Sequence, residues 1–69
     1  MKFKKAIKLM QKGEKLSSEI MDEQYEYVYY NPEFEQFCYT HRLSGIYVQY
    51  IFDIEDILNR EWNLFEGEA

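Results

Sequence analysis

Apolar residues recur at helical spacing near the start of the chain. They stand at positions i, i+3, i+4 and i+7 and are Phe3, Ala6, Ile7 and Met10. Lysines occupy most of the remaining positions, and Gly13 follows at a point where helices commonly end in a left-handed residue. This pattern predicts an α-helix over about residues 3–12.

After Gly13 the pattern alternates every second residue, as β-strands do. Residues 14–20 allow a first strand, although Ser17-Ser18 is poor strand material. Residues 24–31 alternate tyrosines with other residues and run into Asn31-Pro32-Glu33, which is a turn signal. We therefore expect a hairpin whose partner strand covers about residues 34–41.

The second half of the chain adds one more strand, a helical turn and a closing strand. Residues 46–52 carry apolar side chains on both faces and follow a turn at residues 43–45. Asp53 then suits an N-cap, and Asp56 the third helical position, where negative charge favours the helix dipole. The helical turn carries an apolar stripe made of Ile54, Ile57 and Leu58. A short buried strand is expected from Trp62, Leu64 and, out of phase, Phe65.

Together these elements predict an α+β fold with an N-terminal helix, an antiparallel β-meander of three to four strands, a short helical turn and a closing strand. The 69 residues, 8.5 kDa in mass, form a single small domain over residues 1–69, with a frayed tail at residues 66–69. A core of this size supplies only ~3–5 kcal/mol, so we expect a homo-oligomer, a dimer or a tetramer.

Charge is distributed unevenly along the chain. Residues 1–15 hold six lysines and one acid (+5), whereas residues 16–69 hold two arginines and twelve acids (−10), which together give −5. A net acidic chain argues against direct binding to nucleic acid, which needs clustered basic charge. It is compatible with binding to a basic groove of another protein.

Cysteine usage and hydropathy point to a soluble protein of a reducing cytosol. Cys38 is the single cysteine and His41 the single histidine, so we expect neither an intrachain disulfide nor a bound metal or cofactor. No apolar run approaches the ~18–20 residues that span a bilayer, and no apolar signal segment follows the N-terminal lysines.

The chain carries no recognisable catalytic pattern. Cys38 and His41 lie three residues apart, and in a strand this offset points their side chains to opposite faces. Paired acids are frequent, but acids at turns and helix starts are explained by capping and solvation. These pairs are Asp22-Glu23, Glu33/Glu35 and Asp53/Glu55/Asp56. We do not expect an enzyme.

Tyrosine is the residue type that points to a function. All seven tyrosines fall in predicted strands, and so small a protein cannot bury all of them. Exposed tyrosines suit interfaces and stack on nucleobases, while lysine and arginine pair with phosphates. Cross-strand packing within one sheet explains the same pattern equally well. The candidate ligand-binding residues are Lys15, Tyr25, Tyr27, Tyr29, Arg42 and Arg60.

Both ends of the chain resemble a family of small phage proteins. These proteins open with a Phe-x-x-Ala-x-x-x-Leu helix ending in Gly-x-Lys, and close with an acidic Ile-Leu turn and a tryptophan strand. The matching residues here are Phe3, Ala6, Leu9, Gly13 and Lys15, then Ile54-Glu55-Asp56-Ile57-Leu58, Glu61 and Trp62. The arginine and tryptophan that usually follow Gly-x-Lys are replaced by Ser17-Ser18-Glu19-Ile20-Met21.

The family includes the second class of Thoeris anti-defence proteins, which are sponges for cyclic nucleotide immune signals. The resemblance implies a homotetramer that holds its ligand at subunit interfaces without cleaving it. It adds Trp62 to the candidate ligand-binding residues, and Trp62 is equally suited to the core. The fold family is also linked to anti-CRISPR activity.

The resulting hypothesis is a phage counter-defence protein that sequesters a cyclic nucleotide, with Lys15, Arg42 or Arg60 at the phosphates. The alternative is an acidic, anti-CRISPR-like inhibitor that mimics nucleic acid and binds a host defence nuclease. A third reading is a phage accessory protein whose tyrosines form only a subunit interface.

Overall fold

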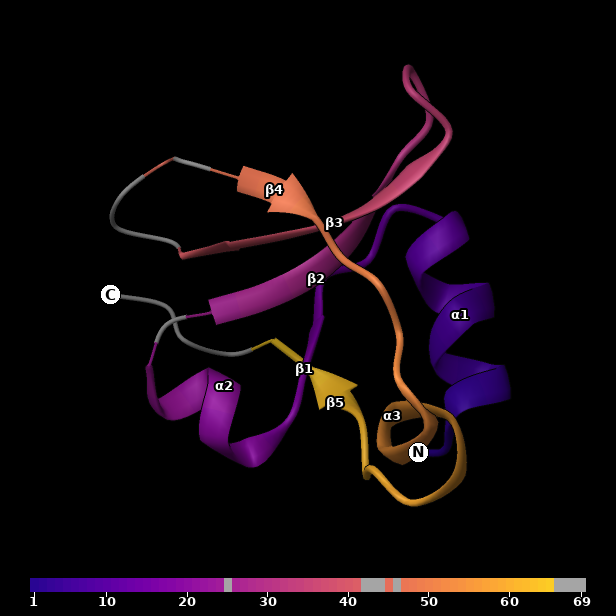
Figure 1. Cartoon of the computed structure of the whole chain (residues 1–69), viewed down its shortest axis with the longest axis vertical. Helices are drawn as coiled ribbons and strands as arrows, with labels where there is room; N and C mark the ends of the chain where they lie inside the picture. The colour runs from indigo at the N-terminus through magenta and orange to yellow at the C-terminus, as the bar shows by residue number, and fades with distance from the viewer. Residues whose placement is uncertain (25, 42–44, 46, 66–69) are drawn as a thin grey trace.

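The chain folds into a five-stranded antiparallel sheet with helices packed on one face (Figure 1). The computed structural model describes residues 1–24, 26–41, 45 and 47–65, apart from the side chains of Ile20, Asp22 and His41. The elements are α1 (Phe3–Gln11), β1 (Leu16–Ser17), α2 (Glu19–Glu23), β2 (Glu26–Asn31), β3 (Gln36–His41), β4 (Tyr47–Gln49), α3 (Ile54–Leu58) and β5 (Asn63–Leu64). The strand order β4-β3-β2-β1-β5 makes β1 to β4 a meander, with β5 added beside β1. The predicted α+β architecture is confirmed.

Helix α1 forms where the apolar spacing predicts it. Ala6 and Met10 are fully buried, while Phe3 and Ile7 are partly buried on the same side. Gly13 follows the helix with a φ of +102°, a conformation that glycine adopts without steric cost. In the described part of the chain, no helix is long and apolar enough to cross a membrane.

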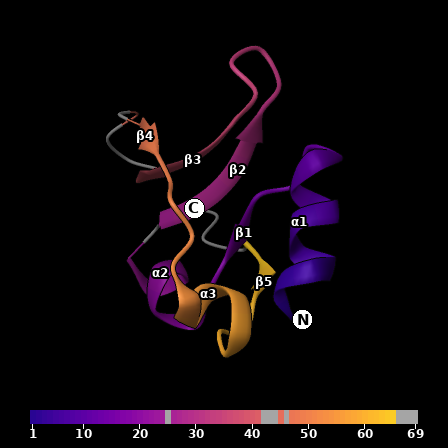
Figure 2. The ribbon, with the colours of Figure 1, turned by 45° about the vertical axis from the view of Figure 1, so that its right-hand side comes forward.

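The hairpin of β2 and β3 is paired over its whole length, from Glu26 opposite His41 to Asn31 opposite Gln36. At its tip the Asn31 side chain accepts a hydrogen bond from the Glu33 amide at 3.0 Å, which closes the predicted turn. The tip projects beyond the rest of the molecule (Figures 1 and 2). The hairpin therefore follows directly from the alternating pattern and the Asn-Pro turn.

Residues 14–20 do not form the strand that the sequence allowed. Only Leu16–Ser17 pairs in the sheet, and helix α2 begins at Glu19. The Ser18 hydroxyl accepts a hydrogen bond from the Met21 amide at 3.3 Å. A serine at this position caps a helix start, and it competes with continuation of the strand.

Helix α3 is capped as predicted, because Asp53 and Asp56 form a reciprocal capping box. Its expected apolar stripe is not buried, since Ile54, Ile57 and Leu58 are all exposed. The closing strand is also less buried than expected, because both of its residues are exposed. The core instead takes its bulk from Trp62, against which the partly buried Phe52 packs.

Candidate ligand-binding face

The two faces of the sheet differ in what covers them. Cross-strand pairing places Leu16, Val28, Tyr39 and Val48 in one row across β1 to β4. Leu16 and Val28 are fully buried in the cluster that also contains Ala6 and Met10 of α1. This row therefore lies on the core face, which α1 covers. Helix α3 contacts α1 (Figure 2). Neighbouring residues along each strand point to the opposite face.

The opposite face carries the three described tyrosines that do not pack against the core, Tyr27, Tyr29 and Tyr47. One row across it contains Ser17, Tyr27, Thr40 and Tyr47, and the next contains Tyr29, Cys38 and Gln49. Lys15 and Phe65 extend this second row, since the Phe65 amide donates to the Lys15 carbonyl at 2.8 Å. We call the larger side chains of this surface, Lys15, Tyr27, Tyr29, Tyr47 and Phe65, the tyrosine face.

A lysine and three aromatic rings meet at one end of the tyrosine face. The Lys15 Nζ atom lies 5.0 Å from the centre of the Tyr27 ring, within the range of a cation–π interaction. The Tyr27 ring centre is 4.8 Å from that of Phe65 and 5.8 Å from that of Tyr29. Lys15 is itself exposed, so its charge is available to a ligand on this surface.

Small residues between the tyrosines make the floor of this surface. Ser17, Cys38 and Thr40 are all buried. Burial and the neighbouring Cys38 raise the pKa of the Tyr29 hydroxyl. Like any tyrosine it keeps its proton at neutral pH, and a protonated hydroxyl can donate a hydrogen bond. Among the described residues, the Ser17 hydroxyl has no hydrogen-bond partner. The face thus combines aromatic surface with one cation and tyrosine hydroxyl donors.

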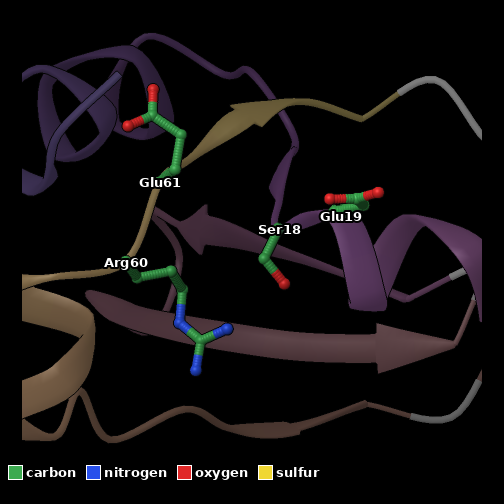
Figure 3. Close-up of a pocket in the computed structure, with 4 residues that line it drawn as sticks. All are labelled: Ser18, Glu19, Arg60 and Glu61. Atoms are coloured by element: carbon green, nitrogen blue, oxygen red, sulfur yellow. The ribbon is translucent and has the colours of Figure 1, made fainter.

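Arg60 and Trp62 lie in a different place, on the core side of the sheet. The Arg60 guanidinium is 6.0 Å from the Trp62 ring, and its Nε donates to Asp56 Oδ1 at 2.5 Å. Arg60 also lines an open pocket of about 220 Å³ together with Ser18, Glu19 and Glu61. Figure 3 shows the Arg60 and Ser18 side chains turned into this space and the two glutamates turned away from it.

Trp62 has a structural role in this arrangement. Its ring is fully buried, and its Nε1 donates to the Asp56 carbonyl at 3.2 Å. A buried ring cannot stack on a ligand, so Trp62 takes the core role, one of the two that the sequence left open. Glu61 pairs with the N-terminal amine, which lowers the pKa of its carboxyl group.

The structure therefore separates the candidate residues predicted from the sequence. It brings Lys15, Tyr27 and Tyr29 together and places Arg60 with Trp62 elsewhere, while Tyr25 and Arg42 lie outside the described residues. Phe65 and Tyr47 were not among the candidates, although their alternation with Leu64 and Val48 places them on the face opposite the core.

Asp56 is a residue whose role the sequence indicated only in part. The sequence identified Asp56 as a capping acid, whereas the structure shows a fully buried side chain that also accepts from Tyr50 at 2.8 Å. Within the described part of the chain, no group of three or more histidine, cysteine or acidic side chains is arranged to hold a metal ion.

Comparisons of the chain with protein-family models, curated protein sequences and solved structures found no match.

Proposed function

We propose that this chain is a phage counter-defence protein that binds a cyclic nucleotide signal on its tyrosine face and sequesters it without cleavage. The observation that carries the proposal is the position of Lys15, with its Nζ 5.0 Å from the Tyr27 ring centre and with Tyr29 and Phe65 beside that ring. The phage context comes from the resemblance at the two ends of the chain.

The chemistry of the tyrosine face suits a small nucleotide better than a nucleic acid strand. Aromatic rings stack on nucleobases, and each stacked base contributes about 1–3 kcal/mol. The single described lysine of the face can neutralise one phosphate, whereas long strands are held by rows of cations. A net charge of −5 repels polyanions further.

Sequestration needs affinity and abundance rather than turnover. A binder that is present in excess over a signal lowers the free concentration of the signal by mass action. The proposal therefore requires tight binding but no nucleophile, general base or metal in the site.

Native mass spectrometry with a mixed panel of cyclic di- and trinucleotides and cyclic ADP-ribose isomers tests the proposal. We expect the protein to gain discrete masses of unmodified ligand and to release the same molecule after heating. Tyr27→Ala should lose this gain, whereas Phe34→Ala, which removes an exposed ring at the hairpin tip, should keep it. A released ligand of altered mass would indicate cleavage and would contradict the proposal.

A second candidate function rests on the hairpin tip. Glu33, Phe34 and Glu35 are all exposed there, and the tip projects from the body (Figure 1). An apolar ring between two acids fits a basic, partly apolar groove of a nuclease that normally binds nucleic acid. Inhibition of such a nuclease that weakens steeply with salt, and that Glu33→Gln/Glu35→Gln abolishes, would support this function.

A further inference from the structure

The open pocket beside Arg60 takes no part in the proposed function. It lies on the core side, between the start of α2 and the loop that joins α3 to β5 (Figure 3). Its volume is about 220 Å³. Pockets that hold drug-sized ligands measure about 300–1,000 Å³, so this pocket suits a molecule smaller than a nucleotide.

Arg60 enters the pocket in a fixed orientation. Its Nε donates to Asp56 Oδ1 at 2.5 Å, and its guanidinium lies 6.0 Å from the Trp62 ring. The two NH₂ groups form no hydrogen bond with a described residue, and 30% of the side chain is exposed. A guanidinium presents its N–H groups in a planar fork that matches the two oxygens of a carboxylate.

Ser18 adds a hydroxyl to the same space. The residue is only 5% exposed, and Figure 3 shows its side chain turned into the pocket. Its Oγ accepts from the Met21 amide at 3.3 Å, and no described group accepts the hydroxyl proton. A serine hydroxyl donates one hydrogen bond as well as accepting. Arg60 and Ser18 therefore offer donors to a single anionic group at the base of the pocket.

The mouth of the pocket has the opposite charge. Glu19 and Glu61 line it with their carboxylates turned away from the base (Figure 3). Glu61 pairs with the Met1 amine and with Lys2 Nζ at 3.5 Å, whereas Glu19 has no ion pair with a described residue. A dianion would meet one guanidinium and repulsion from the mouth, while a positive group at the mouth is attracted. The matching ligand is negative at one end and positive at the other.

We propose that this pocket binds a free α-amino acid, with the carboxylate on Arg60 and Ser18 and the ammonium group toward Glu19. Such a ligand has no net charge, so the net charge of −5 on the chain does not oppose it. The site lies on the other side of the sheet from the tyrosine face and is independent of nucleotide binding.

Nuclear magnetic resonance titration of the ¹⁵N-labelled protein tests this site. The Arg60 Nε–H and the indole N–H of Trp62, the single tryptophan of the chain, are the local reporters. We expect L-alanine to shift both signals along one saturation curve. N-acetyl-L-alanine lacks the ammonium group and L-alaninamide lacks the carboxylate, so each should need at least about tenfold more ligand.

Two variants separate the ends of the ligand. Ser18→Asp keeps an oxygen that can accept from the Met21 amide, but it places a second carboxylate at the base and should abolish saturable binding. Glu19→Gln should weaken L-alanine binding about 2- to 5-fold and narrow its advantage over N-acetyl-L-alanine. Glu23→Gln, which removes an exposed acid at the other end of α2, is the matched control and should bind L-alanine as the unmodified chain does.

The absence of a saturable shift with L-alanine would overturn the proposal. Equal binding of N-acetyl-L-alanine would also overturn it, because the pocket would then recognise carboxylates in general. Both results come from the unmodified chain, so they hold even if a variant misfolds. A well-folded Ser18→Asp that binds L-alanine as tightly as the unmodified chain would show that the ligand sits elsewhere.

Discussion

Two side chains organise the interior at the level of single residues. Trp62 fills the centre of the core, where its ring lies 6.0 Å from that of Phe52. Asp56 holds the surrounding backbone and side chains by accepting from Tyr50, Arg60 and the Asp53 amide. A buried carboxylate with three donors is satisfied, whereas one that has lost its partners is costly.

Trp62→Ala should unfold the protein or nearly so. Removing a buried tryptophan costs roughly 3–5 kcal/mol, which is comparable to the whole stability of a domain of this size. Leu64→Ala is the matched control, since Leu64 is exposed two residues further on, and it should change the free energy of unfolding by less than about 1 kcal/mol. Urea denaturation measures both, and an unchanged midpoint for Trp62→Ala would show that the ring is not in the core.

We expect a loss of stability at high pH from Tyr39 and Tyr50, which are partly buried against the core. A hydrogen bond to Glu26, together with burial, raises the pKa of Tyr39 from its usual 10.0 to about 12. Because the folded pKa lies above the unfolded one, this contribution is fully present below pH 10 and is lost as the pH rises toward 12. Burial and Asp56 shift the pKa of Tyr50 in the same direction.

We therefore expect the free energy of unfolding to fall more steeply between pH 10 and 12 for the unmodified protein than for Tyr39→Phe. Denaturant titrations at several pH values measure the two slopes. Parallel slopes would show that the Tyr39 hydroxyl has the same pKa in the folded and unfolded chains.

At the level of elements, α3 depends on its cap more than on its apolar stripe. The helix has five residues, too few to be stable without tertiary contacts or capping. The Asp56 amide donates to the Asp53 side chain at 2.9 Å, and the Asp53 amide donates to the Asp56 side chain at 3.1 Å. The stripe of Ile54, Ile57 and Leu58 contributes little burial because it is exposed.

Asp53→Ala should therefore destabilise the protein by about 0.5–2 kcal/mol, the usual cost of losing an N-cap. Ile54→Ala, next to it in sequence, should cost less than about 0.5 kcal/mol because the side chain is exposed. Thermal unfolding of the two variants compares them directly. A larger loss for Ile54→Ala would mean that the stripe is covered in solution.

The sequence predicted the elements whose signals are local. The spacing of Phe3, Ala6 and Met10, the Asn31-Pro32 turn and the Asp53 cap each act within a few residues, and all three predictions are confirmed. Burial was harder to predict, because it depends on which element covers which. The stripe of α3 has a core-like spacing, yet Phe52 and Trp62 already occupy the core beneath the sheet.

At the level of the whole molecule, the sheet separates a structural side from a candidate binding side. Helices α1 and α3 and the ring of Trp62 lie on the core side, and the tyrosine face lies on the other. From the alternation along the strand, the sequence predicted that Tyr27 and Tyr29 point to the same face. It could not show that Arg60 belongs to the core side, because Arg60 lies in a loop, where strand alternation does not apply, and pairs there with the buried Asp56.

The central claim is that the tyrosine face binds a cyclic nucleotide, and isothermal titration calorimetry on a face variant tests it most directly. The titrant is the cyclic nucleotide retained in native mass spectrometry, and the proteins are the unmodified chain, Tyr27→Ala and Phe34→Ala. Loss of one stacked ring should raise Kd about 5- to 150-fold for Tyr27→Ala and leave Phe34→Ala unchanged. Equal affinity of Tyr27→Ala and the unmodified chain, or no binding by any of the three, would contradict the claim.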